Sequence, residues 1–80
     1  MTLYTNQVVY PEGDIQEIPH RLRVNQVVDL NGYPLPLPLP TYKLIAYRVF
    51  RISTQETRGE IVTSFYLELL NRDMLSEYLR

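Results

Sequence analysis

Apolar and polar residues alternate along much of the chain, and a period of two predicts β-strands rather than helices. Between Leu22 and Leu30 the even positions are mostly apolar and the odd ones mostly polar, which predicts a half-buried strand. Asn25 interrupts this strand and predicts a bulge or a left-handed backbone position. The run from Tyr42 to Ile52 is partly apolar on both faces, which predicts a central strand.

Two further strands and two turns follow from the remaining alternation. The first ten residues predict a short strand that ends at Pro11, and Asp14 with Glu17 predicts a single capped helical turn. The polar residues 53–59 predict a hairpin loop whose glycine has positive φ, and Glu60 begins an antiparallel return strand. One face of that strand then carries Ile61, Thr63, Phe65, Leu67 and Leu69.

The C-terminal segment predicts a short helix. Asn71 is a favourable N-cap, and Leu75 and Leu79 recur at helical spacing, so we expect a helix from about residue 72 to residue 79. The alternative is a helix that begins at Ser64, because a four-residue period also links a second set of side chains. That set is Tyr66, Leu70, Met74 and Tyr78.

The segment from Tyr33 to Thr41 alternates leucine with proline. Each leucine precedes a proline, which excludes the helical region and favours extended backbone. We therefore expect an edge strand or arm whose leucines share one face and keep their N–H groups for a neighbour, while the proline edge lacks donors. A ligand for an SH3-type groove is the alternative, but no two of these prolines are three residues apart. The leucines concerned are Leu35, Leu37 and Leu39.

Composition narrows the class of protein. A chain of 80 residues with 45 % hydrophobic content predicts one domain, residues 1–80, with a single small core. No cysteine is present, so disulfides cannot reinforce the fold, and a homo-oligomer could hide further apolar surface. A net charge of −1 argues against extensive phosphate binding. No stretch is apolar enough to span a membrane, and we expect a soluble cytoplasmic protein.

These elements predict a mainly β fold: a small open barrel of the SH3-like type, or a bent antiparallel sheet of about four or five strands, with a short C-terminal helix. Residues 22–32 resemble the second strand of SH3-like small barrels, with an apolar pair, a turn residue, a valine-rich strand and a loop. Asn25 stands where such barrels usually have glycine. The resemblance concerns architecture and implies no function.

Candidate catalytic groups are sparse. His20 is the single histidine, and the serines lack the glycine-flanked turn that exposes a nucleophile. Glu12, Asp14 and Glu17 are closely spaced carboxylates but lack the remaining ligands of a calcium loop. We therefore expect no enzyme activity, no metal and no cofactor.

Two binding functions remain. The first is a non-catalytic module that self-associates or binds a protein through its sheet edge, proline arm or terminal helix, and seven tyrosines suit such an interface. Its candidate contact residues are Tyr33, Leu35, Leu37, Leu39 and Tyr42.

The alternative is a small barrel that binds nucleic acid through stacked aromatic rings and arginines. Because alternate residues of a strand share a face, Lys43, Tyr47 and Arg51 of the predicted central strand lie on one face. Arg21 and Arg23 of the preceding predicted strand could extend that face.

Overall fold

The structure is a computed structural model that describes residues 1–41 and 43–79, and within them the chain forms five strands and one short helix. This mainly β architecture with a C-terminal helix confirms the expected fold class. In chain order the elements are β1 (Leu3–Val9), β2 (Ile15–Ile18), β3 (Val27–Val28), β4 (Tyr47–Thr57), β5 (Glu60–Leu69) and α1 (Arg72–Ser76).

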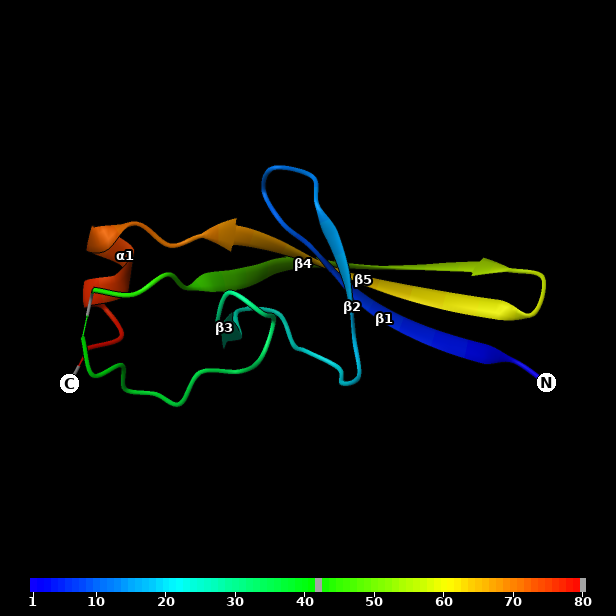
Figure 1. Cartoon of the computed structure of the whole chain (residues 1–80), viewed down its shortest axis with the longest axis horizontal. Helices are drawn as coiled ribbons and strands as arrows, with labels where there is room; N and C mark the ends of the chain where they lie inside the picture. Colours follow the sequence, from blue (N-terminus) through cyan, green and yellow to red (C-terminus); the bar gives the residue numbers. More distant parts are fainter. Residues whose placement is uncertain (42, 80) are drawn as a thin grey trace.

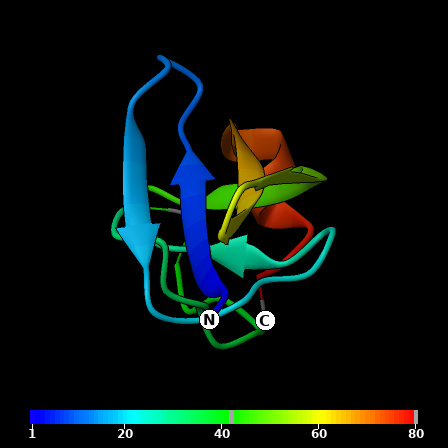
Figure 2. The same ribbon diagram turned by 90° about the vertical axis from the view of Figure 1, so that its right-hand side faces the viewer.

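The strands form one curled sheet in the order β2-β1-β5-β4-β3 (Figure 2). The pairs β1–β2, β3–β4 and β4–β5 are antiparallel, whereas β1 and β5 pair parallel, so the sheet is mixed and not purely antiparallel. The parallel pair has a simple cause, since five strands that alternate in direction bring the first and last into the same direction. The ring stays open between β2 and β3, which makes the sheet a half-barrel.

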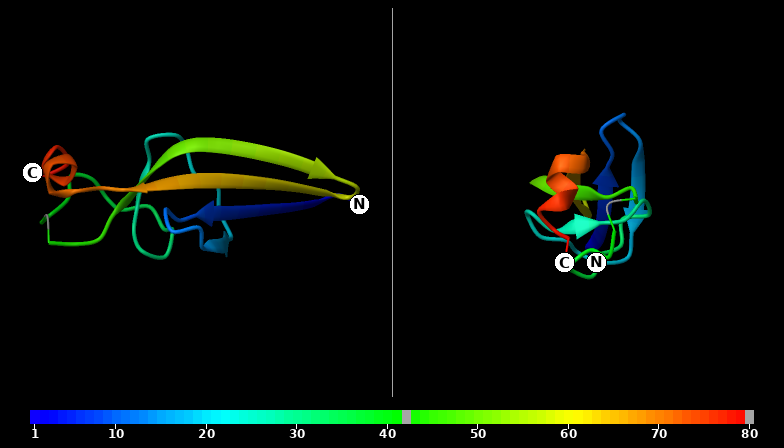
Figure 3. Two further views of the ribbon diagram at one scale, coloured as in Figure 1. Left: turned by 90° about the horizontal axis from the view of Figure 1, so that it is seen from above. Right: turned by 90° about the vertical axis from the view of Figure 1, so that its left-hand side faces the viewer.

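The molecule is elongated because the β4–β5 hairpin, together with the start of β1, extends beyond the packed part (Figure 1). Its principal extents are 45 × 22 × 17 Å and its radius of gyration is 13.7 Å. A compact domain of this length has a radius of gyration of about 12 Å. Helix α1 lies at one end of the long axis and the hairpin turn at the other (Figures 1 and 3).

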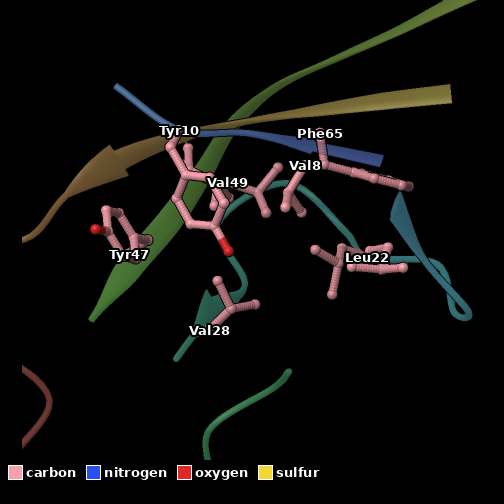
Figure 4. Close-up of a cluster of buried hydrophobic side chains, with 9 residues drawn as sticks. Val8, Tyr10, Leu22, Val28, Tyr47, Val49 and Phe65 are labelled. Atoms are coloured by element: carbon pink, nitrogen blue, oxygen red, sulfur yellow. The ribbon is translucent and has the colours of Figure 1, made fainter. Parts of the chain in front are cut away.

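A first apolar cluster fills the inner, concave face of the half-barrel (Figure 4). Phe65, Val8 and Val49 are its fully buried centre, contributed by three adjacent strands. Tyr10 and Tyr47 close one end, with ring centroids 5.2 Å apart and planes at 72°. The whole cluster comprises Val8, Tyr10, Ile18, Leu22, Val28, Tyr47, Val49, Phe65 and Leu67.

A second apolar cluster lies on the outer face of the sheet, at the α1 end. Val27 and Val28 show the division, because successive strand residues point to opposite faces and these two belong to different clusters. The expectation of a single core is therefore wrong: the proline arm and α1 form a layer of their own over one end of the sheet. The second cluster comprises Val27, Leu39, Ala46, Leu70 and Leu75.

The leucine-proline arm is extended but does not form one continuous strand. Leu35 donates its N–H to the Val27 carbonyl at 3.0 Å, and Leu39 donates to Tyr78 at 2.6 Å. Leu39 is 1 % exposed and Leu35 is half-buried, whereas Leu37 is 53 % exposed. The expectation that leucine N–H groups bind a neighbour is confirmed for two residues, and the expectation of one shared apolar face is wrong for Leu37.

Several predicted boundaries move because tertiary contacts override local pattern. Of residues 22–30 only the pair in β3 is strand, while Asn25 has the expected positive φ of 73° and donates its N–H to Val49. The predicted strand 42–52 begins only at Tyr47, and residues 53–57, predicted as loop, continue β4 up to the Arg58–Gly59 turn.

The two helical predictions near charged residues have opposite outcomes. Asp14 and Glu17 form no helical turn, because residues 15–18 pair with β1 as β2. Helix α1 begins at Arg72 as expected, with the Asn71 side chain accepting the Met74 N–H at 2.9 Å, but it ends at Ser76. The alternative helix from Ser64 is wrong, since that segment is β5.

Candidate interaction surface

A β-bulge in β4 gives the outer face its most unusual feature. The register of β4 on β5 shifts between Val49 and Arg51. Val49 is fully buried and Ile52 packs against the first cluster, whereas Phe50 is 51 % exposed and Arg51 is exposed. The extra residue therefore leaves two consecutive side chains on the outer face, where regular alternation would allow one.

These two side chains converge on Tyr66 of β5. The Arg51 guanidinium carbon lies 4.1 Å from the centre of the Tyr66 ring, within cation–π range. The Phe50 and Tyr66 ring centroids are 6.5 Å apart with planes at 58°. An exposed contact of the first kind contributes about 0.5–1 kcal/mol, enough to orient the guanidinium without burying it.

The cluster continues across the sheet as a row of facing residues. Arg51 lies opposite Tyr66, Tyr66 opposite Val9 of β1, and Val9 opposite Ile15 of β2. Directly opposed residues project to the same face, so the row crosses four strands. Ile15 is 60 % exposed, and Val9 and Tyr66 are half-buried. We call Ile15, Val9, Tyr66, Phe50 and Arg51 the outer row.

The polar neighbours of the outer row are engaged with each other. On the α1 side, Arg48 Nε donates to Glu68 at 3.1 Å and its Nη1 donates to the Tyr78 hydroxyl at 3.0 Å. Both hydrogen bonds raise the pKa of Arg48, and the bond to Tyr78 contributes more than the bond to Glu68. On the hairpin side, Gln7 donates to Ser64 at 3.0 Å. The layer over the outer face ends at Tyr78, and the outer row begins directly beyond it.

The predicted partner-binding residues are dispersed. Tyr33 is 48 % exposed and its ring contacts that of His20, with centroids 4.9 Å apart and planes at 40°. Its backbone N–H and carbonyl bind Asp29. Leu35 and Leu37 line a groove of about 500 Å³ between the arm and residues 23–27. Leu39 is core, and Tyr42 lies outside the described residues.

The predicted basic-aromatic stripe is not formed. Tyr47 is 7 % exposed and belongs to the first cluster. Arg51 lies on the outer face, because the extra residue of the bulge turns it to the face opposite to that of Tyr47. Lys43 is exposed in the loop before β4, Arg21 is exposed beside the buried Leu22, and Arg23 lies at the groove. Of the five predicted residues, the structure places Arg51 alone in the outer row.

Sequence reasoning missed Tyr66, Val9 and Ile15 as surface residues of one patch. Their registers depend on β1 pairing with β5, a contact between segments more than fifty residues apart. A local signal of the bulge did exist, since Val49 and Ile52 are both core-type residues three positions apart. Regular alternation cannot send both to one face, so the spacing implies one additional residue.

Tyr10 and Tyr47 have perturbed acidities. Burial raises the pKa of both phenols, and nearby charges, including that of Glu12, raise it further. The Tyr10 hydroxyl also donates to the Leu30 carbonyl at 2.7 Å, a bond that needs the protonated form. These groups close the inner face and provide no nucleophile at neutral pH.

The raised phenol pKa values predict loss of stability in alkali. The folded state holds its phenolic protons more tightly than the unfolded chain, so the contribution is complete below about pH 10 and declines as pH rises through the folded pKa. We expect urea midpoints to fall between about pH 9 and pH 11, and to fall less for Tyr47→Phe. If the urea midpoints of the wild-type protein and Tyr47→Phe fall equally steeply with pH, this assignment is contradicted.

No metal centre is apparent in residues 1–41 and 43–79, which contain no cluster of three or more His, Cys, Asp or Glu side chains. His20 binds the Gly32 carbonyl through Nε2 at 2.8 Å and thereby fixes a turn. Among the described residues no helix is long and apolar enough to cross a membrane.

Comparison with known proteins identifies a family. Residues 2–78 match the model of a family described as "Uncharacterised Treponema protein", so the chain belongs to that family. No curated protein and no solved structure matches the chain.

Proposed function

We propose that this member of the family is a non-catalytic protein-interaction module whose contact surface is the outer row. The observation that carries the proposal is the bulge, which exposes Phe50 and Arg51 together beside Tyr66. Aromatic residues and arginine are enriched in the centres of protein interfaces, where a few of them supply most of the binding energy.

The surroundings of the outer row support the same function. Its apolar members form one strip across the sheet, and the adjacent polar groups already hydrogen-bond to each other. A partner could therefore cover the strip without stripping water from unpaired charges at its borders. The proposed setting is the cytoplasm, where a chain without cysteine is unaffected by reducing conditions.

Nucleic-acid binding is the weaker proposal. It would use Arg51 stacked on Tyr66, an arrangement that could also receive a base. The other cations proposed for it, such as Lys43 and Arg23, lie elsewhere, and the net charge is −1. A single cation in the outer row offers little neutralisation of phosphate.

Site-specific photo-crosslinking tests the proposal. Phe50 is replaced by benzoylphenylalanine, which keeps an aromatic side chain, and the protein is irradiated in its own host cell. We expect a discrete protein adduct at position 50. Leu69, 55 % exposed and outside the outer row, is the matched control position and should give none. The absence of a protein adduct at position 50 contradicts the proposal, and a nuclease-sensitive adduct supports the alternative.

A further inference from the structure

One edge of β4 is bare from Arg51 to Thr57. β3 pairs with β4 only at its first two residues, and the loop before β3 reaches no further than Val49, through hydrogen bonds of 2.7 and 3.0 Å. Residues 53–57 are all exposed, and no described segment pairs with this side of β4 (Figure 3). The hairpin therefore presents unpaired strand backbone to solvent.

The backbone groups on this edge follow from the hairpin turn. Thr57 and Glu60 flank the two-residue turn and form the last hydrogen-bonded pair, so alternate residues back along β4 direct their N–H and C=O toward β5. The residues between them, Ile52, Thr54 and Glu56, direct theirs outward. Each of these three can donate and accept one hydrogen bond with an added strand.

The edge lacks the usual protection against pairing. Residues 51–57 contain no proline and no lysine, and the bulge lies before them. Natural sheets commonly block exposed edges with these residues, with bulges or with a covering segment. An edge of this length without them is a ready template for another strand.

We propose that the strand added to this edge is β4 of a second copy of the chain, paired antiparallel about a two-fold axis at Thr54. This proposal rests on the proposed interaction function and adds a second contact surface, the edge of β4 beside the outer row. Thr54 then faces the same residue of the second copy, Ile52 faces Glu56, and Arg51 faces Thr57. Identical strands related by a two-fold axis normal to the sheet must pair antiparallel, so the edge is complementary to itself.

Charge favours this arrangement. Arg51 makes one end of the edge positive, while Glu56 and Glu60 outnumber Arg58 at the turn end. Antiparallel pairing sets each end against the opposite end of the other copy, and no like charges face each other directly. Parallel pairing would stack positive on positive and negative on negative.

The size of the contact sets its strength. A single added strand buries less than the roughly 1,200 Å² at which stable interfaces begin, so the dimer is weak and depends on concentration. Light scattering over a concentration series should show a monomer at micromolar and a growing dimer fraction toward millimolar concentration.

Disulfide trapping tests the register, because the natural chain has no cysteine. In a dimer centred on Thr54, two Thr54→Cys thiols lie within the range of a disulfide, whereas Thr57→Cys thiols are about 20 Å apart. Both positions are exposed, so both variants should fold. We expect mild oxidation to convert Thr54→Cys to covalent dimer on the order of tenfold more than Thr57→Cys.

A charge variant provides an independent measurement. Thr54→Lys places two like charges opposite each other and should abolish the dimer, whereas Gln55→Lys, which faces Ser53, should keep it. Equal trapping at positions 54 and 57, or no trapping at either, overturns the proposal. If these tests fail while position 50 still gives a protein adduct, a second copy is excluded at this edge and the interaction function stands.

Discussion

Replacing Leu39 by alanine is expected to lower the free energy of unfolding by about 2–5 kcal/mol, as for other large-to-small core substitutions. Leu39 is 1 % exposed and packs in the second cluster, while its N–H binds the Tyr78 carbonyl. Truncation leaves a cavity where the proline arm meets the C-terminal segment. The arm and α1 should loosen together, because Leu39 and Leu75 of α1 are buried in the same cluster.

Leu37 supplies the matched control, since it belongs to the same arm but is 53 % exposed. Leu37→Ala should change the free energy of unfolding by no more than about 0.5 kcal/mol. Urea denaturation measures both. A domain of this length has only about 4–12 kcal/mol in total, so Leu39→Met, expected to cost less than about 1.5 kcal/mol, keeps the comparison measurable. Similar losses for Leu37→Ala and Leu39→Ala would refute this account of the arm.

Replacing Gly32 by alanine should cost about 2–4 kcal/mol, from two causes. Gly32 has a φ of +85°, a left-handed conformation that alanine adopts poorly. A Cβ there would also lie 3.2 Å from Ile18 Cγ2 and 3.6 Å from Val8 Cγ2, inside the first cluster. The Ile18 side chain would have to shift, whereas the distance to Val8 is an ordinary van der Waals contact.

Gly59 separates the two causes. Its φ of +80° is nearly the same, but a Cβ would meet nothing within 4 Å. Gly59→Ala should therefore lose only the conformational part, about 1–2 kcal/mol, in the same urea experiment. If the two glycine variants lose equal stability, the close approach to Ile18 carries no penalty and Gly32 is constrained by its backbone alone.

The fold elements that sequence predicted well are those with strong local chemistry. Asn71 begins α1 because its side chain satisfies the Met74 N–H. The glycines take positive φ because they have no Cβ, and Asn25 does so because asparagine tolerates the left-handed region. β5 follows its alternation through Thr63, Phe65 and Leu67, which are buried in turn. Leu69 breaks the pattern at 55 % exposure, opposite Tyr47 at the end of the first cluster.

The elements that sequence predicted poorly depend on distant partners. Residues 15–18 follow the turn residues 11–14 and include Glu17, which with Asp14 predicted a helical turn, yet they form β2 because β1 offers a paired edge. Residues 22–26 alternate like a strand, yet they form an irregular segment, with Leu22 alone buried among them. The outer row was hidden for the same reason, since its residues come from four strands and align only after the bulge has shifted the register.

By itself the sequence determined the strand-rich class, the turns at glycine and asparagine, the N-cap of α1 and the extended character of the proline segment. These follow from backbone sterics and from side chains acting on their own neighbours. Only the tertiary structure decided which β-prone segments found partners, that the apolar residues divide into two clusters, and that Phe50 and Arg51 share a face. Those outcomes depend on which strand lies beside which, and the alternation of apolar residues does not encode that choice.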